Sequence, residues 1–103
     1  MSIMSDMFKK AVLQKLQEHR EALRQVYGVQ SLILFGSVAR STANPTSNVD
    51  LFVTFAEPAT FDQYMNLKFH LEDLLQCSVD LVTKGAVRPH IMPKIEREGV
   101  HAA

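Results

Sequence analysis

The sequence predicts an α+β fold in which helices alternate with the strands of a small sheet, in the order αβαβαβα. Three short apolar runs end at turn-forming residues, as strands do: Gln30–Phe35, Val49–Phe55 and Val79–Val82. The segments before, between and after these runs have the apolar spacing of helices. A chain of 103 residues suits one domain, 1–103, with a modest core.

The expected helices have recognisable ends. The first, Met7–Tyr27, is amphipathic and stops at Gly28, because glycine readily adopts the left-handed conformation that ends helices. The second begins after Thr60, which has the spacing of a capping box with Gln63, and extends to about Gln76.

The last helix ends at Glu98, before Gly99. Its start is Pro89 or Pro93, and the later start is favoured because proline fits only the first turn of a helix.

The first strand ends in a feature that suits a bound anion. Gly36 permits a close backbone turn, and the residues from Ser37 to Arg40 have the character of a first helical turn. Free backbone N–H groups at a helix start attract anions, and Arg40 adds positive charge. The alternatives are an ordinary strand-ending turn for Gly36 and Ser37 and a structural salt bridge for Arg40.

Oxygen-bearing side chains lie on the next two strands. Asn48 and Asp50 are two residues apart, so they share a strand face, and Asp80 occupies a similar place in the third strand. A carboxylate inside an apolar strand is costly unless it is paired or bound to a metal ion. These residues are therefore candidate ligands of a divalent cation.

A shared site fixes the strand directions. Ser37 follows the first strand while Asp50 opens the second, so the two strands must be antiparallel. Asp80 opens the third strand, which must then run parallel to the second, with the intervening helix as a crossover. The prediction is a mixed three-stranded sheet.

This stretch resembles the minimal nucleotidyltransferases, a branch of the DNA polymerase beta superfamily. That family has a Gly-Ser pair, a ten-residue gap, an Asp-x-Asp pair and a third Asp on a later strand. Gly36–Ser37, Asp50 and Asp80 match in order and spacing, and Ala39–Arg40 is also similar to the family. Asn48 departs from the pattern, because the family has its first Asp there.

The resemblance implies nucleotidyl transfer, in which a hydroxyl attacks the α-phosphorus of ATP. Asn48, Asp50 and Asp80 would take the metal and catalytic positions for two Mg²⁺ ions, and Gly36, Ser37 and Arg40 would bind the triphosphate. An amide at Asn48 carries no charge, so transfer and metal binding should both be weakened.

The resemblance also implies a partner: small members of this kind act as antitoxins to a HEPN-domain ribonuclease toxin and add AMP to one of its tyrosines. A hetero-oligomer is therefore expected. The alternatives are an inactive module that neutralises its partner by complex formation and a transferase acting on a small-molecule hydroxyl. After the second helix buries its core face, Phe61, Met65 and Phe69 are left over as a candidate partner surface.

Composition bounds the remaining possibilities. Lys plus Arg and Asp plus Glu number 11 each, so no basic excess favours direct nucleic-acid or membrane binding. No signal peptide or membrane span is evident, and the single cysteine, Cys77, cannot form an internal disulfide. A cytoplasmic location is therefore expected.

Overall fold

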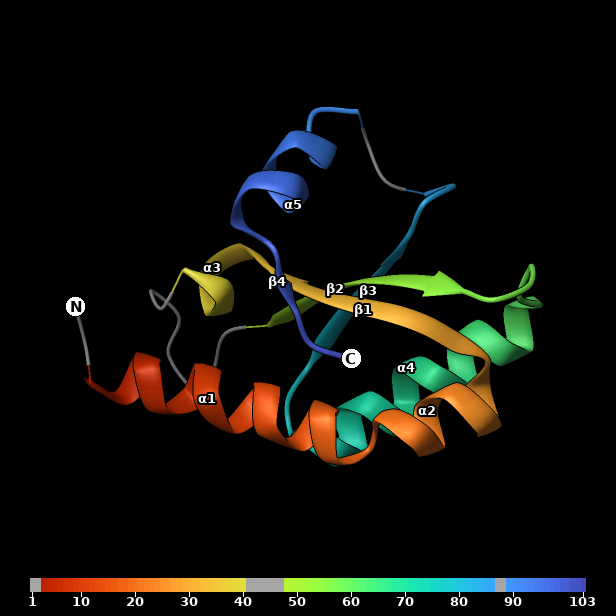
Figure 1. The fold of residues 1–103 in the computed structure, drawn as a ribbon, viewed down its shortest axis with the longest axis horizontal. Coiled ribbons are helices and arrows are strands. Elements are labelled where there is room, and N and C mark those ends of the chain that lie inside the picture. The colour runs from red at the N-terminus through yellow and green to blue at the C-terminus, as the bar shows by residue number, and fades with distance from the viewer. Residues whose placement is uncertain (1–2, 41–47, 87–88) are drawn as a thin grey trace.

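The computed structural model describes residues 3–40, 48–86 and 89–103 (Figure 1). Helices and strands alternate as expected for an α+β fold. In chain order the elements are α1 Ile3–Glu18, α2 Arg20–Tyr27, β1 Val29–Phe35, α3 Gly36–Ala39, β2 Val49–Phe55, α4 Phe61–Leu75, β3 Val79–Thr83, α5 Met92–Glu98 and β4 Val100–His101.

The sheet is mixed, and its strand order is β3-β2-β1-β4. As predicted, β1 and β2 are antiparallel, and β2 and β3 are parallel with α4 as the crossover between them. The prediction of three strands was wrong, because Val100 and His101 form a fourth strand against Leu34 and Ile33. A two-residue strand is too short to show the alternation by which strands are recognised in a sequence.

The first predicted helix is in fact two helices, which meet at His19. The His19 ring places Nδ1 2.9 Å from the carbonyl oxygen of Lys15, and the backbone there leaves the helical region. Local side-chain bonds of this kind compete with the helical hydrogen-bond pattern. Helix α2 stops at Gly28, where the sequence predicted the end of the first helix, and Gly28 has a left-handed φ of 70°.

The predicted start of α4 is confirmed, but its capping box is only half formed. The Gln63 backbone N–H donates to Thr60 Oγ1 at 3.1 Å. The Gln63 side chain, however, donates to the carbonyl oxygen of Tyr27 at 2.7 Å and so ties α4 to the end of α2. The later start of the last helix is also confirmed, since α5 has Pro93 in its first turn.

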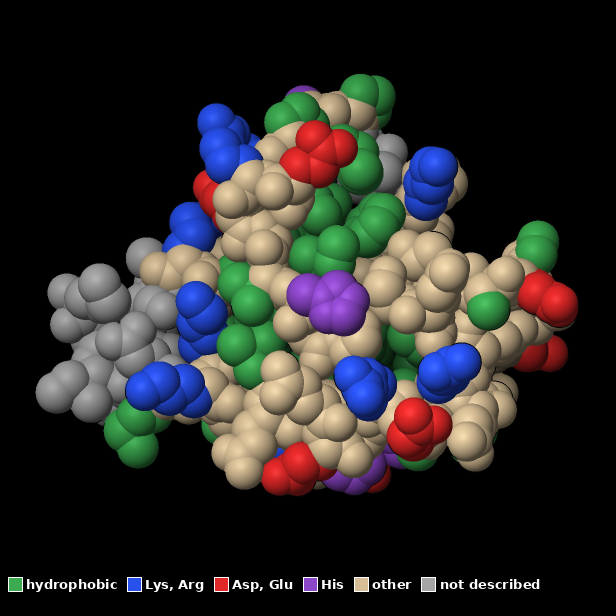
Figure 2. Space-filling model, in the orientation of Figure 1, with side chains coloured by type: hydrophobic (Ala, Val, Ile, Leu, Met, Phe, Trp, Pro, Cys, Tyr) green, Lys and Arg blue, Asp and Glu red, His purple; other side chains and the backbone are tan. Residues whose placement is uncertain are grey.

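The two faces of the sheet are covered unequally. Helices α1, α2 and α4 lie against one face, and the short α5 lies over the other (Figure 1). The first face carries the larger core, which includes Leu16, Leu32, Leu51, Leu67 and Leu71, all fully buried. On the second face the buried cluster within the described residues is smaller and consists of Phe35, Phe52 and Ile95. Figure 2 accordingly shows hydrophobic side chains between α5 and the strands.

Some hydrophobic side chains stay outside both cores. Phe61 and Phe69 on α4 are 75% and 57% exposed, whereas Met65 between them is half-buried. Within the described part of the chain, no helix is both long enough and apolar enough to cross a membrane.

Candidate active site

Two carboxylates lie side by side at the start of the parallel strand pair. Asp50 in β2 and Asp80 in β3 are direct register partners. Side chains at paired positions of neighbouring strands point to the same face of the sheet. Asp50 is half-buried, whereas Asp80 is exposed. The strand directions therefore bring together two of the residues that the sequence singled out.

The environment of Asp50 disfavours its ionised form. Burial, the negative charge of Asp80 and the hydrogen bond to Asp80 raise the pKa of Asp50 to about 6, and the positive charge of Arg40 opposes this shift. A pair of neighbouring carboxylates resists full ionisation unless a positive charge joins it. A cation between these side chains would relieve that cost.

Gly36 lies directly against Asp50. Its φ of 75° is in the left-handed region that favours glycine, and a Cβ atom there would come within 2.2 Å of Asp50 Oδ2. Phe35, the residue before it, is the register partner of Asp50 in β2. Any side chain at position 36 would displace the carboxylate, so a glycine is required for this close approach.

Arg40 follows the short helix α3 and makes an ion pair. Its Nη1 lies 2.8 Å from Glu98 Oε2 on α5. Arg40 also acts on Asp50, as the charge that opposes the rise in its pKa. The salt-bridge alternative is thus realised here, although the Arg40 side chain remains 45% exposed.

The two remaining candidate residues, Ser37 and Asn48, lie near the carboxylates in sequence. Asn48 is exposed and precedes the first residue of β2. Ser37 is half-buried in α3, directly after Gly36. Among the described residues, no cluster of three or more Asp, Glu, His or Cys side chains could hold a metal ion, so the carboxylate set is limited to a pair.

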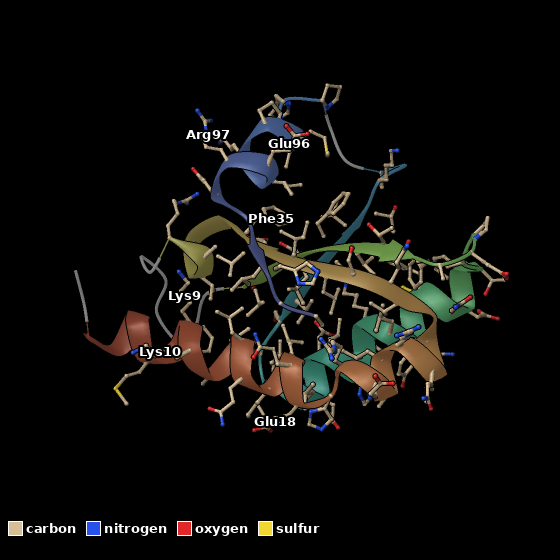
Figure 3. All side chains as sticks on the ribbon, viewed as in Figure 1. Lys9, Lys10, Glu18, Phe35, Glu96 and Arg97 are labelled. Carbon is tan, nitrogen blue, oxygen red and sulfur yellow. The ribbon has the colours of Figure 1, made fainter. Side chains whose placement is uncertain are left out.

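A pocket of about 480 Å³ opens beside this pair. Figure 3 shows one of its walls, the Phe35 side chain, between β1 and α5. The residues that line the pocket come from the sheet, from α4 and from the approach to α5: Phe35, Asp50, Tyr64, Lys68, Asp80, Leu81, Val82, Ala86, His90 and Ile91.

Three of these polar residues were not expected at a site from the sequence. These residues are Tyr64, Lys68 and His90. A sequence signal did exist, because residues four apart on a helix share a face and Lys68 follows Tyr64 by four. Only the packing of α4 along β3 brings that face to Asp80.

A larger cavity, of about 740 Å³, lies at the opposite ends of β2 and β3. It is lined largely by apolar residues such as Phe55, Pro58 and Phe61, and neither carboxylate reaches it. Tyr64 and Ala86 line both hollows. The smaller pocket is the better candidate site, because the side chains of Asp50, Asp80 and Lys68 all line it.

A close backbone turn beside paired carboxylates is typical of proteins that handle metal-bound phosphates. The sequence profile of the family described as "Nucleotidyltransferase domain" matches residues 16–101. The chain therefore belongs to the nucleotidyltransferase domain family.

Named relatives and solved structures agree with that family. The chain is 36% identical over 86 residues to the protein adenylyltransferase MntA of Thermococcus cleftensis, and the match covers 84% of this chain and 87% of that protein. A solved "putative minimal nucleotidyltransferase" is 36% identical and superimposes with a TM-score of 0.70 over 85% of this chain and 93% of its own.

A third similarity concerns the fold alone. The structure of a tri-AMPylated Shewanella oneidensis HEPN toxin in complex with an MNT antitoxin contains a chain that is 18% identical. The two chains superimpose with a TM-score of 0.59, over 97% of this chain and 72% of that one. The predicted fold is therefore confirmed by independent structures.

Proposed function

We propose that this chain is a protein adenylyltransferase of the minimal nucleotidyltransferase type, which transfers AMP from ATP to a hydroxyl of a partner protein. One observation carries the proposal: Asp50 and Asp80 are paired in register at the end of β1 where Gly36 turns. The kinship with protein adenylyltransferase MntA at 36% identity supports the substrate class.

Each residue of the site has a role in this proposal. Gly36 and Ser37 bind the terminal phosphates, and the absence of a side chain at Gly36 leaves room for the Asp50 carboxylate next to them. Arg40 neutralises the charge of the triphosphate, which requires it to exchange Glu98 for phosphate. Asp80 takes the proton of the acceptor hydroxyl.

The residues also fit the Mg²⁺ ions that such transferases use. Mg²⁺ is usually held by one or two carboxylates together with substrate phosphates, and the Asp50–Asp80 pair supplies that donor set. The raised pKa of Asp50 indicates a pair that would gain from a cation. Asp50, Asp80 and the side-chain oxygen of Asn48 would hold the metal, and bound Mg²⁺ stabilises charge on the attacking and departing oxygens.

The partner in this proposal is a HEPN-domain toxin, and the assembly is a hetero-oligomer. The similar fold in a complex of an MNT antitoxin with an AMPylated HEPN toxin supports it. The exposed Phe61 and Phe69 on α4 offer an apolar surface for that contact. If this surface binds the toxin, Phe61→Ser and Phe69→Ser should weaken the complex in calorimetry without lowering the melting temperature.

Asn48 favours a second candidate function. It places an exposed, uncharged amide where the family has a carboxylate, so the total ligand charge for metal is lower by one. A chain with this residue would neutralise its partner through binding alone, without transferring AMP. The transferase and the binding module would bind the partner alike, because Asn and Asp have nearly the same shape. They differ only in whether AMP is transferred.

Mass spectrometry of the partner tests both candidates. The HEPN-domain protein is incubated with this chain, ATP and Mg²⁺, and an added AMP is sought on its tyrosines. The proposal expects slow modification that is lost in an Asp50→Asn variant. Complex formation without modification, even with the Asn48→Asp variant, would favour the binding module. The absence of both would refute the proposed partner.

A further inference from the structure

The strongest unassigned feature of the molecule is Lys68, a half-buried cation in the pocket of the two carboxylates. With the described residues it makes neither a hydrogen bond nor an ion pair. Its ammonium is therefore available to a group bound in this pocket.

The place of Lys68 is set by a contact one helical turn earlier. The Tyr64 hydroxyl donates a hydrogen bond to the carbonyl oxygen of Leu81 and so fastens α4 to the edge strand β3. Because α4 connects two parallel strands, it runs opposite to β3. Lys68 therefore lies about 6 Å further along the helix, toward the start of β3 where Asp80 is found.

The sheet order separates two sides of the site. Gly36 and Arg40 follow β1, Asp50 lies on the central strand β2, and Asp80 and Lys68 lie on the β3 side. In phosphoryl-type transfer, the attacking and leaving oxygens are roughly in line through the phosphorus. If the pyrophosphate leaves on the β1 side, the acceptor must approach from the β3 side.

We propose that the pocket between Lys68 and Asp80 receives the acceptor, and that Lys68 contacts its hydroxyl oxygen. The walls formed by Leu81, Val82 and Ile91 are apolar, which suits the aromatic ring of the tyrosine acceptor in the proposed function. This inference rests on the proposed function, since it takes the position of the triphosphate from it.

The chemical step balances without further reactants. The acceptor O–H bond breaks and its proton passes to the Asp80 carboxylate. The oxygen bonds to the α-phosphorus of ATP, while the bond from that phosphorus to the bridging oxygen breaks and pyrophosphate leaves. Lys68 changes no bond: its ammonium donates a hydrogen bond to the acceptor oxygen and stabilises the negative charge that develops there.

The first test measures binding and does not depend on turnover. N-acetyl-tyrosinamide is titrated into ¹⁵N-labelled protein that is saturated with AMP-PNP and Mg²⁺. The amide signals of Leu81 and Val82 should shift. Lys68→Met should weaken this binding by about tenfold, as the loss of a hydrogen bond to a charged group predicts, while Lys68→Arg retains most of it. Lys94→Met, which removes an exposed lysine from α5, is the matched control.

The second test measures transfer to the partner in the Asn48→Asp background. Lys68→Met should lower kcat/KM for the acceptor and leave KM for ATP unchanged, with melting curves as the folding control. Each of three outcomes would overturn the inference. These are weaker AMP-PNP binding in Lys68→Met, no shift of the Leu81 and Val82 amide signals, and a loss of acceptor binding in Lys94→Met as large as that in Lys68→Met. Transfer that is indifferent to Lys68→Met refutes this inference alone, whereas probe binding without any transfer refutes the proposed function alone.

Discussion

The two faces of the sheet are built for different purposes. The face beneath α1, α2 and α4 is a continuous apolar core in which leucines such as Leu51 and Leu67 are fully buried. The face beneath α5 has a small core, and its rim carries Asp50 and Asp80. The difference follows from the strand period of two, which sends Leu51 to one face and Asp50 to the other.

This division separates stability from chemistry. Burying apolar area is the dominant favourable term in folding, so the first face contributes most of the stability. At neutral pH the neighbouring pair of carboxylates contributes none, since the fold raises the pKa of Asp50 and so disfavours its ionised form. Substitutions on the two faces should therefore have separable effects, and the following four predictions test that separation.

The largest effect is expected at Asn48. Asn48→Asp should raise AMP transfer to the partner by orders of magnitude, because it restores a negative charge among the proposed metal ligands. Partner affinity should stay nearly constant. Rates are compared by mass spectrometry for the present chain, the Asn48→Asp form and a form that carries Asn48→Asp together with Asp50→Asn. Equal rates in the first two would show that position 48 is not a metal ligand.

The second effect concerns the packed face. Leu67→Ala removes a fully buried side chain from α4 and should lower the free energy of unfolding by about 2–5 kcal/mol. The matched change Ile91→Ala, at a half-buried position beside α5, should cost less than half as much. Urea unfolding measures both. A similar loss in the two variants would contradict the unequal contribution of the faces.

The third effect concerns the choice of Arg40 between Glu98 and phosphate. Glu98→Gln should tighten AMP-PNP binding a few-fold because it frees Arg40, and Arg40→Met should weaken it about tenfold. Stability should change by less than about 1 kcal/mol in either variant, since the pair is partly exposed. Calorimetry with Mg²⁺ present distinguishes a phosphate-binding role of Arg40 from a structural one. If neither substitution changes the affinity for AMP-PNP, Arg40 has a structural role only.

The smallest effect is a pH dependence of stability. Folding raises the pKa of Asp50 from 3.8 to about 6, so the folded protein binds this proton more tightly than the unfolded chain does. The associated stability is fully present below pH 3.8 and is lost as the pH rises through about 6. Because Asp50 is half-exposed, the loss should be less than about 1 kcal/mol.

Thermal unfolding at pH 4–8 in EDTA measures this loss. Asp50→Asn should remove it, whereas Asp73→Asn, at an exposed carboxylate of α4, should not. Added Mg²⁺ should restore stability at pH 7–8 by replacing the proton. A pH profile that Asp50→Asn leaves unchanged would mean that the carboxylate pair does not oppose folding.

The sequence alone was sufficient for most of the architecture. Short apolar runs bounded by turns gave the positions of β1, β2 and β3, and the requirement that Asp50 and Asp80 share a site gave their directions correctly. Local chemistry also fixed several ends, as at Gly28 and Thr60, because capping depends on only a few adjacent residues.

Only the tertiary structure decided features that depend on contacts between distant residues. The break at His19 is local but weakly signalled in the sequence. Strand β4, in contrast, depends on pairing with the distant β1, and Gly99 before it lies close to Ile33, where a Cβ would come within 2.5 Å of Ile33 Cγ2. The pairing of Arg40 with Glu98 joins residues far apart in sequence, and so does the pocket that Lys68 shares with the two carboxylates. Periodicity reports which face of an element is apolar, but the partner of its polar face is set by packing.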